Sequence, residues 1–159
     1  MNKIFKAFCR IYQATFHLAL PLLPYRSPHV CQSVNDLADV LARLKAEAAL
    51  LVTDQGVVNA GLAAPVEALL ARCGVRCVRY DGTQPNPTVY NVEEALKLYH
   101  AGGCGCIIAL GGGSAMDCAK GVGARVAYPK RSLRQLKGLL KVLRRIPALI
   151  AIPLSLIHI

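Results

Sequence analysis

Three consecutive glycines, Gly111, Gly112 and Gly113, follow the apolar run Cys106–Leu110. After them, Ser114 opens a pattern typical of a helix that continues to about Val126. Because glycine has no Cβ, its backbone can turn tightly and bring N–H groups close to a diphosphate. A strand before the run and a helix after it are the context that a phosphate-binding loop requires, although a tight turn alone would also use glycines.

Two aspartates stand where they could support such a loop. Asp54 ends the run Ala48–Thr53, at a position where an acid can accept hydrogen bonds from ribose hydroxyls and would repel a 2′-phosphate. This favours NAD over NADP, but Asp54 would also suit a solvated turn before Gly56. Asp117 stands three residues after Ser114, so these two residues could form a capping box.

The elements that would position these residues alternate between helix and strand. Strands are expected at 48–53, 75–80, 106–110 and 148–152, mostly as continuous apolar runs typical of strands buried on both faces. Helices are expected at 33–47, 58–73 with an early break at Pro65, 91–101 and 114–126. This alternation predicts an α/β fold, a parallel sheet with helices on both faces. The glycine run lacks the G-x-G-x-x-G spacing and follows the third strand rather than the first, and both features disfavour a standard Rossmann domain.

The composition indicates one folded domain without a metal site. The chain has 159 residues, of which 54% are hydrophobic and 18% charged, so it can build a core and is too apolar to be disordered. Its seven cysteines match neither a zinc pattern nor a disulfide framework, and we expect reduced thiols in a cytoplasmic protein. Cys118 is interpreted as a small buried side chain, with a reactive thiol as the alternative. The histidines, His100 among them, show no ligand spacing.

The net charge of +10 would suit an anionic partner, but much of it lies in one segment. Lys130–Arg145 interleaves basic residues with leucines at helical spacing, which is typical of an amphipathic basic helix or loop. We interpret it as the solvated outer face of a helix before the fourth strand; acidic lipid or nucleic acid would be the alternative partners. Residues 1–32 form an N-terminal lead-in, and Met1–Pro24 is typical of an amphipathic helix packed on the protein body. Its apolar run is too short to span a bilayer. We therefore expect no membrane and no nucleic acid as partners.

Three separated motifs resemble the iron-containing alcohol dehydrogenase family in their order and spacing. They are Val52-Thr53-Asp54, then Tyr80-Asp81-Gly82 leading into Pro85-Asn86-Pro87-Thr88, then Gly111-Gly112-Gly113-Ser114-Ala115-Met116-Asp117-Cys118-Ala119-Lys120. The lead-in Leu23-Pro24-Tyr25-Arg26 resembles a bacterial branch of the same family. The resemblance covers about Ala7 to Pro153.

The resemblance implies a dinucleotide-binding α/β domain over residues 33–153, Rossmann-like and similar to that of dehydroquinate synthase. An all-helical domain follows it in the family and supplies one Asp and three His to the metal; that domain is missing from this sequence. Asp54 and Asn86 would contact the adenosine side of the cofactor or its phosphates. The residues implied to form or brace the diphosphate loop are Gly112, Gly113, Ser114 and Asp117.

The family pattern is lost after Pro153. The remaining residues, Leu154–Ile159, match the translation of CTG TCT CTT ATA CAC ATC, the end of a transposon adapter used in sequencing libraries. Residues 154–159 are therefore expected to be a sequencing-adapter artefact and no part of the domain.

For the full-length protein, the resemblance implies an NAD(P)-dependent alcohol dehydrogenase that transfers hydride between a small alcohol or aldehyde and the nicotinamide. It would use Fe²⁺ or another divalent metal, NAD with NADP possible, and form a homodimer. The 159-residue chain would hold the cofactor half and be inactive alone. A non-catalytic module that binds a nucleotide or a polyanion is the alternative. Ser114 and Asn86-Pro87-Thr88 disfavour the dehydroquinate synthase and glycerol-phosphate dehydrogenase relatives.

Overall fold

The computed structural model describes residues 10, 13–14, 29–31, 33, 36–138 and 140–154. The chain divides into two compact units, residues 1–30 and 31–159, and the fold described below is that of the second. The amphipathic helix expected over Met1–Pro24 and the adapter-like tail lie almost wholly outside the described residues. Within the described ranges, no helix has both the length and the apolar character needed to cross a membrane.

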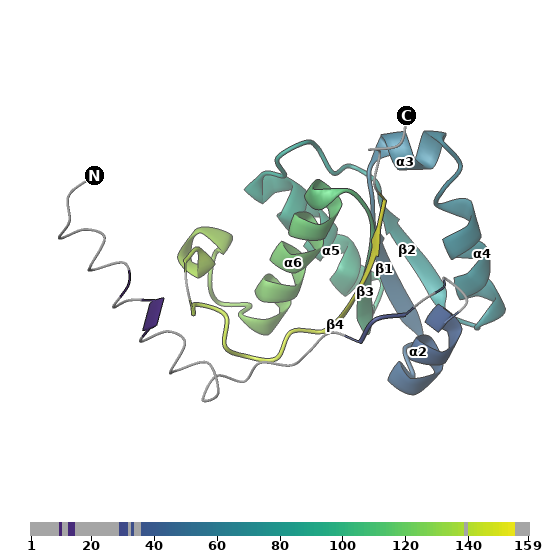
Figure 1. The fold of residues 1–159 in the computed structure, drawn as a ribbon, viewed down its shortest axis with the longest axis horizontal. Helices are drawn as coiled ribbons and strands as arrows, with labels where there is room; N and C mark the ends of the chain where they lie inside the picture. The colour runs from purple at the N-terminus through teal and green to yellow at the C-terminus, as the bar shows by residue number, and fades with distance from the viewer. Residues whose placement is uncertain are drawn as a thin grey trace. The chain divides into compact units, whose positions relative to one another are not determined.

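The second unit is built on a parallel sheet of four strands in the order β2-β1-β3-β4 (Figure 1). The strands are β1 (Ala48–Val52), β2 (Arg76–Tyr80), β3 (Cys106–Gly111) and β4 (Ala148–Pro153). Leu50 pairs with Val78 on one side and with Ile107 on the other, so β1 lies inside the sheet. Every residue of β1 and β3 is buried, as their continuous apolar sequences predict.

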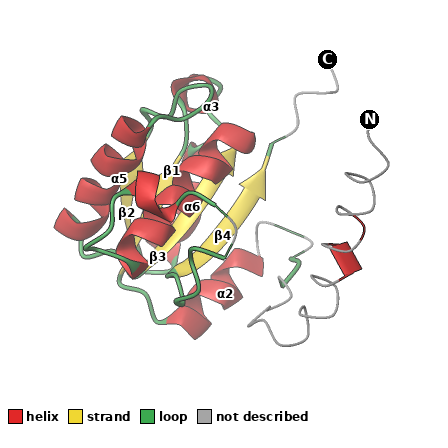
Figure 2. Cartoon of the chain, turned by 90° about the vertical axis from the view of Figure 1, so that its left-hand side faces the viewer, coloured by secondary structure: helices red, strands yellow, loops and turns green. Residues whose placement is uncertain are grey.

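Helices cover both faces of this sheet (Figures 1 and 2). They are α2 (Asp36–Leu44), α3 (Gln55–Asn59), α4 (Ala64–Arg72), α5 (Val89–Ala101) and α6 (Gly113–Ala127). One face packs against α2 and α4 through Leu41 and Leu70, and the other against α5 and α6 through Ala95 and Val122. The predicted α/β class with a doubly covered parallel sheet is confirmed.

Two expectations about the helices need correction. The single helix expected from residue 58 to 73 is two helices, α3 and α4, with a break at residues 60–63 that includes Gly61 at φ +74°. Pro65 lies in the first turn of α4 rather than causing a break inside it, because its missing N–H is unpaired there in any case. The basic segment is not a long amphipathic helix: among its described residues only Leu133–Leu136 are helical, as one 3₁₀ turn.

Candidate cofactor-binding site

The order of the strands along the sheet reverses between β1 and β3. The chain leaves β1 toward β2 through α3 and α4, whereas it leaves β3 in the opposite direction toward β4 through α6, on the other face. Such a reversal leaves the ends of two neighbouring strands uncovered, and ligands of open α/β sheets bind there. Asp54 and Gly111 stand at this point, one beyond the end of β1 and the other at the end of β3.

Asp54 holds the turn beyond β1 and also faces the glycine run. Its Oδ1 accepts a hydrogen bond of 3.0 Å from the Val57 N–H, which makes Asp54 the N-cap of α3. Its Oδ2 is 3.4 Å from the position that a Cβ on Gly111 would take. The carboxylate therefore lies beside the glycine run. The backbone of Asp54 also forms an isolated β-bridge with Gly82, in the loop after β2.

Gly111 can be replaced only with strain. Its φ is +140°, which L side chains rarely adopt, and a Cβ there would lie 3.2 Å from the Cβ of Ala115. Its carbonyl accepts a hydrogen bond of 2.9 Å from the Leu154 N–H, so the end of β4 is fixed beside it. Gly111 was not among the predicted cofactor-binding residues, although its place in the glycine run was a signal for it.

Gly112 and Gly113 instead face open space. A Cβ on either residue would meet nothing within 4 Å. Gly112 is the N-cap of α6 and gives that helix no side-chain cap, so the first N–H groups of a helix of 15 residues point from an exposed end. The partial positive charge of that helix end adds to them, and the result is a place suited to an anion.

The predicted capping box of Ser114 and Asp117 is wrong. The glycines allow α6 to begin at Gly113, so Ser114 is already the second helical residue and Asp117 is a full turn inside. The Asp117 side chain is 67% exposed and pairs with Lys120 at 3.3 Å. Ser114 is half-buried beside the exposed glycines, close to the helix end.

Asn86 lies in the loop between β2 and α5, which runs along the same carboxyl edge of the sheet (Figure 1). Its φ is +56°, in the left-handed region that asparagine tolerates better than most residues, and it is exposed. The hydrogen bonds that hold this loop are made by Gly82 and Thr88. Among the described residues, none joins Asn86 to Asp54 or Gly112.

A buried amide that the sequence reasoning missed holds this loop. The Asn91 side chain is 4% exposed, and its Nδ2 donates to the Tyr80 hydroxyl at 3.2 Å and to the Gly82 carbonyl at 3.0 Å. Its Oδ1 accepts from the Thr88 N–H at 2.9 Å, in a capping box that starts α5. An asparagine three residues after a threonine was the signal, but the helix was expected to start two residues later.

Cys118 is a fully buried residue of α6, about a turn and a half inside the helix. Burial raises the pKa of its thiol. This agrees with the interpretation as a small buried side chain, since a reactive cysteine needs exposure and a lowered pKa. The described cysteines are all free thiols, and the described residues contain no group of three or more His, Cys, Asp or Glu that could hold a metal.

The comparisons with known proteins agree with this geometry. The model of a family described as iron-containing alcohol dehydrogenase matches residues 29–156. The chain belongs to the iron-containing alcohol dehydrogenase family. Alcohol dehydrogenase 4 of Schizosaccharomyces pombe is 36% identical over 115 residues, which are 70% of this chain and 27% of that protein.

Solved structures of other dehydrogenases and reductases contain a domain of the same fold. The alcohol dehydrogenase from Oenococcus oeni is 31% identical with a TM-score of 0.71, over 76% of this chain and 32% of its own. The fold is also shared with a sulfoacetaldehyde reductase from Bifidobacterium kashiwanohense in complex with NAD⁺, at 22% identity and a TM-score of 0.68, over 82% and 35% of the two chains. The chain thus spans about a quarter to a third of the length of these proteins.

Proposed function

We propose that this chain is the cofactor-binding part of an alcohol dehydrogenase that transfers hydride between a small alcohol or aldehyde and NAD. The observation that carries the proposal is the uncapped start of α6 over open space, with the Asp54 carboxylate beside it, just beyond the neighbouring strand β1. An anionic diphosphate fits the first feature, and a ribose with free hydroxyls fits the second. Membership of the family supports the same reaction class.

The residues proposed to hold NAD divide by position. The backbone of Gly112 and Gly113 would donate N–H groups to the diphosphate, and Ser114 and Asp117 are the further residues that the family motif assigns to this loop. Asp54 and Asn86 would contact the adenosine side or the phosphates. The Asp54 carboxylate would also repel a 2′-phosphate, which favours NAD while leaving NADP possible. The bound nicotinamide supplies the hydride chemistry, and these residues bind and orient it.

The described residues contain no group of three or more His, Cys, Asp or Glu that could bind the metal of this family. The domain boundaries proposed are a lead-in at 1–32, the dinucleotide-binding domain at 33–153 and an adapter-derived tail at 154–159. In the full-length protein, a further part would supply the metal site and the substrate pocket, and the protein would act as a homodimer in the cytoplasm.

Alcohol-dependent formation of NADH, followed by absorbance, tests this proposal. The full-length gene product should produce NADH from a small primary alcohol and NAD⁺ when loaded with Fe²⁺, whereas the chain of 159 residues should bind NAD⁺ without turnover. Tighter binding of DNA than of NAD⁺ by the chain would favour a polyanion-binding module instead, and turnover by the chain alone would refute its proposed inactivity.

A further inference from the structure

The positive charge of the chain is unevenly distributed along the sequence. Residues 36–129 contain eight Lys and Arg against nine Asp and Glu, so the α/β body is close to neutral. Residues 130–145 contain seven basic and no acidic residues, and residues 1–35 contain four basic and no acidic ones. The net charge of +10 therefore comes from two basic stretches, of which the structure describes the second almost completely.

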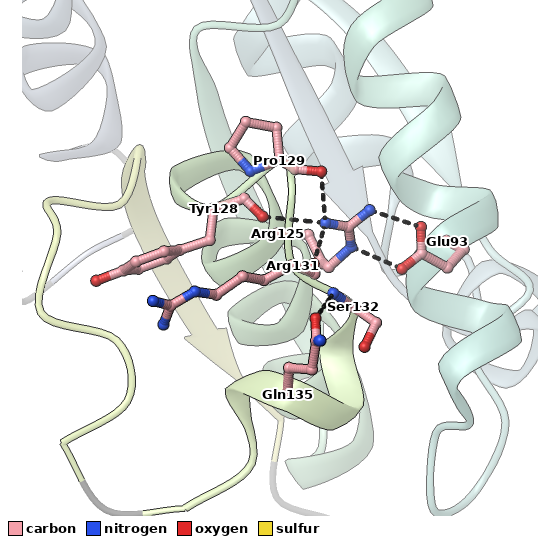
Figure 3. A network of polar contacts seen from close by, with 7 residues as sticks. All are labelled: Glu93, Arg125, Tyr128, Pro129, Arg131, Ser132 and Gln135. Atoms are coloured by element: carbon pink, nitrogen blue, oxygen red, sulfur yellow. Dashed lines mark hydrogen bonds and ion pairs between the residues drawn. The ribbon is translucent and has the colours of Figure 1, made fainter.

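The basic segment, defined as Lys130–Arg145, is fixed to the body at its start. The Arg125 guanidinium, in α6, pairs with Glu93 in α5, with 2.7 Å between Nε and Oε1 (Figure 3). The same guanidinium donates to the carbonyls of Tyr128, Pro129 and Arg131. The chain thus leaves α6 along a defined path rather than as a loose loop.

Tyr128 fixes the far end of the same segment. Its hydroxyl accepts hydrogen bonds of 3.0 Å from the N–H groups of Leu143 and Arg144, and these donors lower the pKa of the phenol. The guanidinium groups of Arg131 and Arg144 lie 5.1 and 5.0 Å from the centre of its ring. Cation–π contact at this distance keeps both arginines near the ring while they remain exposed.

Between these two anchors, the segment exposes aliphatic side chains next to its charges. Leu136 is buried, but Leu140, Val142 and Leu143 are 48%, 36% and 57% exposed. All seven basic residues are exposed, and none of them takes part in the ion pairs found among the described residues. The solvated outer face expected from the sequence would have turned these aliphatic side chains inward.

The segment lies away from the proposed cofactor site. It joins the end of α6 to the start of β4, so it is at the amino edge of the parallel sheet (Figure 1). Asp54 and the glycine run are at the carboxyl edge, where the described chain also ends after β4. A ligand on the basic segment therefore leaves the carboxyl ends of β1 and β3 free for the cofactor.

We propose that the basic segment is a docking surface for an anionic lipid bilayer. Seven Lys and Arg side chains attract the acidic headgroups, and Leu140, Val142 and Leu143 enter the boundary between headgroups and acyl chains. Nucleic acid fits less well, because exposed aliphatic side chains make no favourable contact with phosphates and the described segment offers no exposed aromatic ring for bases to stack on. This proposal departs from the expectation of a chain without a membrane partner.

Vesicle co-sedimentation of the full-length gene product tests this surface. We expect binding to phosphatidylcholine vesicles that contain phosphatidylglycerol, little binding to phosphatidylcholine alone, and release at high salt. The variants Lys141→Gln/Arg145→Gln and Leu140→Ser/Leu143→Ser should each weaken binding about tenfold or more, judged from the typical contribution of a basic or aliphatic side chain at a bilayer surface.

Matched variants on other parts of the body serve as controls. Arg43→Gln/Arg72→Gln removes the same charge from α2 and α4, and Leu44→Ser/Leu98→Ser removes side chains that are each 37% exposed. Both should bind vesicles like the unmodified protein. The proposal is overturned if the full-length protein does not sediment with acidic vesicles, if control and segment variants behave alike, or if duplex DNA binds more tightly than the vesicles.

Discussion

Replacing Gly113 by alanine separates the two possible uses of the glycine run. Gly113 is the first residue of α6, and an added Cβ would meet no protein atom within 4 Å. Alanine is favoured over glycine inside a helix by about 0.8–1.0 kcal/mol, so the variant should be as stable as the unmodified protein or more stable by up to that amount. If the run were a tight turn and nothing more, no other property should change.

The effect on NAD follows from the space that the methyl group would fill. A phosphate oxygen bound to the Gly113 N–H would lie about 2.9 Å from that nitrogen. A Cβ on the same residue would project into the space that is open beside it. A Cβ there would weaken a charge-assisted hydrogen bond worth about 1.5–3 kcal/mol, which corresponds to roughly tenfold to hundredfold weaker binding.

Gly111→Ala is the matched contrast. Its φ of +140° and the nearby Asp54 Oδ2 and Ala115 Cβ predict a loss of stability of about 1–3 kcal/mol from strain. Thermal unfolding measures the stability of both variants, and calorimetric titration with NAD⁺ measures affinity. A Gly113→Ala protein that is fully folded and binds NAD⁺ like the unmodified protein would refute the diphosphate assignment.

Three further predictions concern the surroundings of the site. Asp54→Asn should keep the N-cap of α3, since asparagine also caps helices, but should lower the ratio of the affinity for NAD to that for NADP, measured by titration with each cofactor. An unchanged ratio of affinities would contradict the role given to the Asp54 charge. Asn91→Leu should lower the free energy of unfolding by about 1–3 kcal/mol, because it removes the hydrogen bonds of the buried amide to the Tyr80 hydroxyl, the Gly82 carbonyl and the Thr88 N–H, and it should weaken NAD⁺ binding. Tyr90→Leu, at an exposed neighbour, should change neither quantity. Burial raises the pKa of the Cys106 thiol from 9.0 to about 11, so the contribution of the neutral thiol to the free energy of unfolding is complete below pH 9 and is lost as the pH rises toward 11. Between pH 8 and 10.5, urea unfolding of Cys106→Ala should therefore show a fall in this free energy that is about 2 kcal/mol smaller than that of the unmodified protein. Equal falls in the two proteins would contradict the pKa shift.

The sheet and its two covered faces could be predicted from the sequence because continuous apolar runs such as Cys106–Leu110 have few other uses. The positions of Asp54 and the glycine run were predictable for a similar reason, since each follows a buried strand. The N-cap of α6 was misplaced by two residues, because it is Gly112 and not Ser114, and Ser114 is therefore a helical residue and not a cap.

The basic segment shows where periodicity failed. Leucines at helical spacing predicted a helix, but Arg125 and Tyr128 fix the chain through main-chain carbonyls and N–H groups that a helix would have used internally. Asn91 was missed because its partners, Tyr80 and Gly82, are distant in sequence. Contacts of this kind depend on tertiary structure, which a local pattern does not encode.

Hydrogen exchange of the full-length protein with and without NAD⁺ tests the central claim most directly, because it reports which backbone N–H groups the cofactor covers. We expect NAD⁺ to slow hydrogen exchange at the amides of Gly112–Asp117 and of the turn at Asp54, and to leave the exchange of Lys130–Arg145 unchanged. Protection confined to the basic segment, or no protection at the start of α6 at saturating NAD⁺, would contradict it.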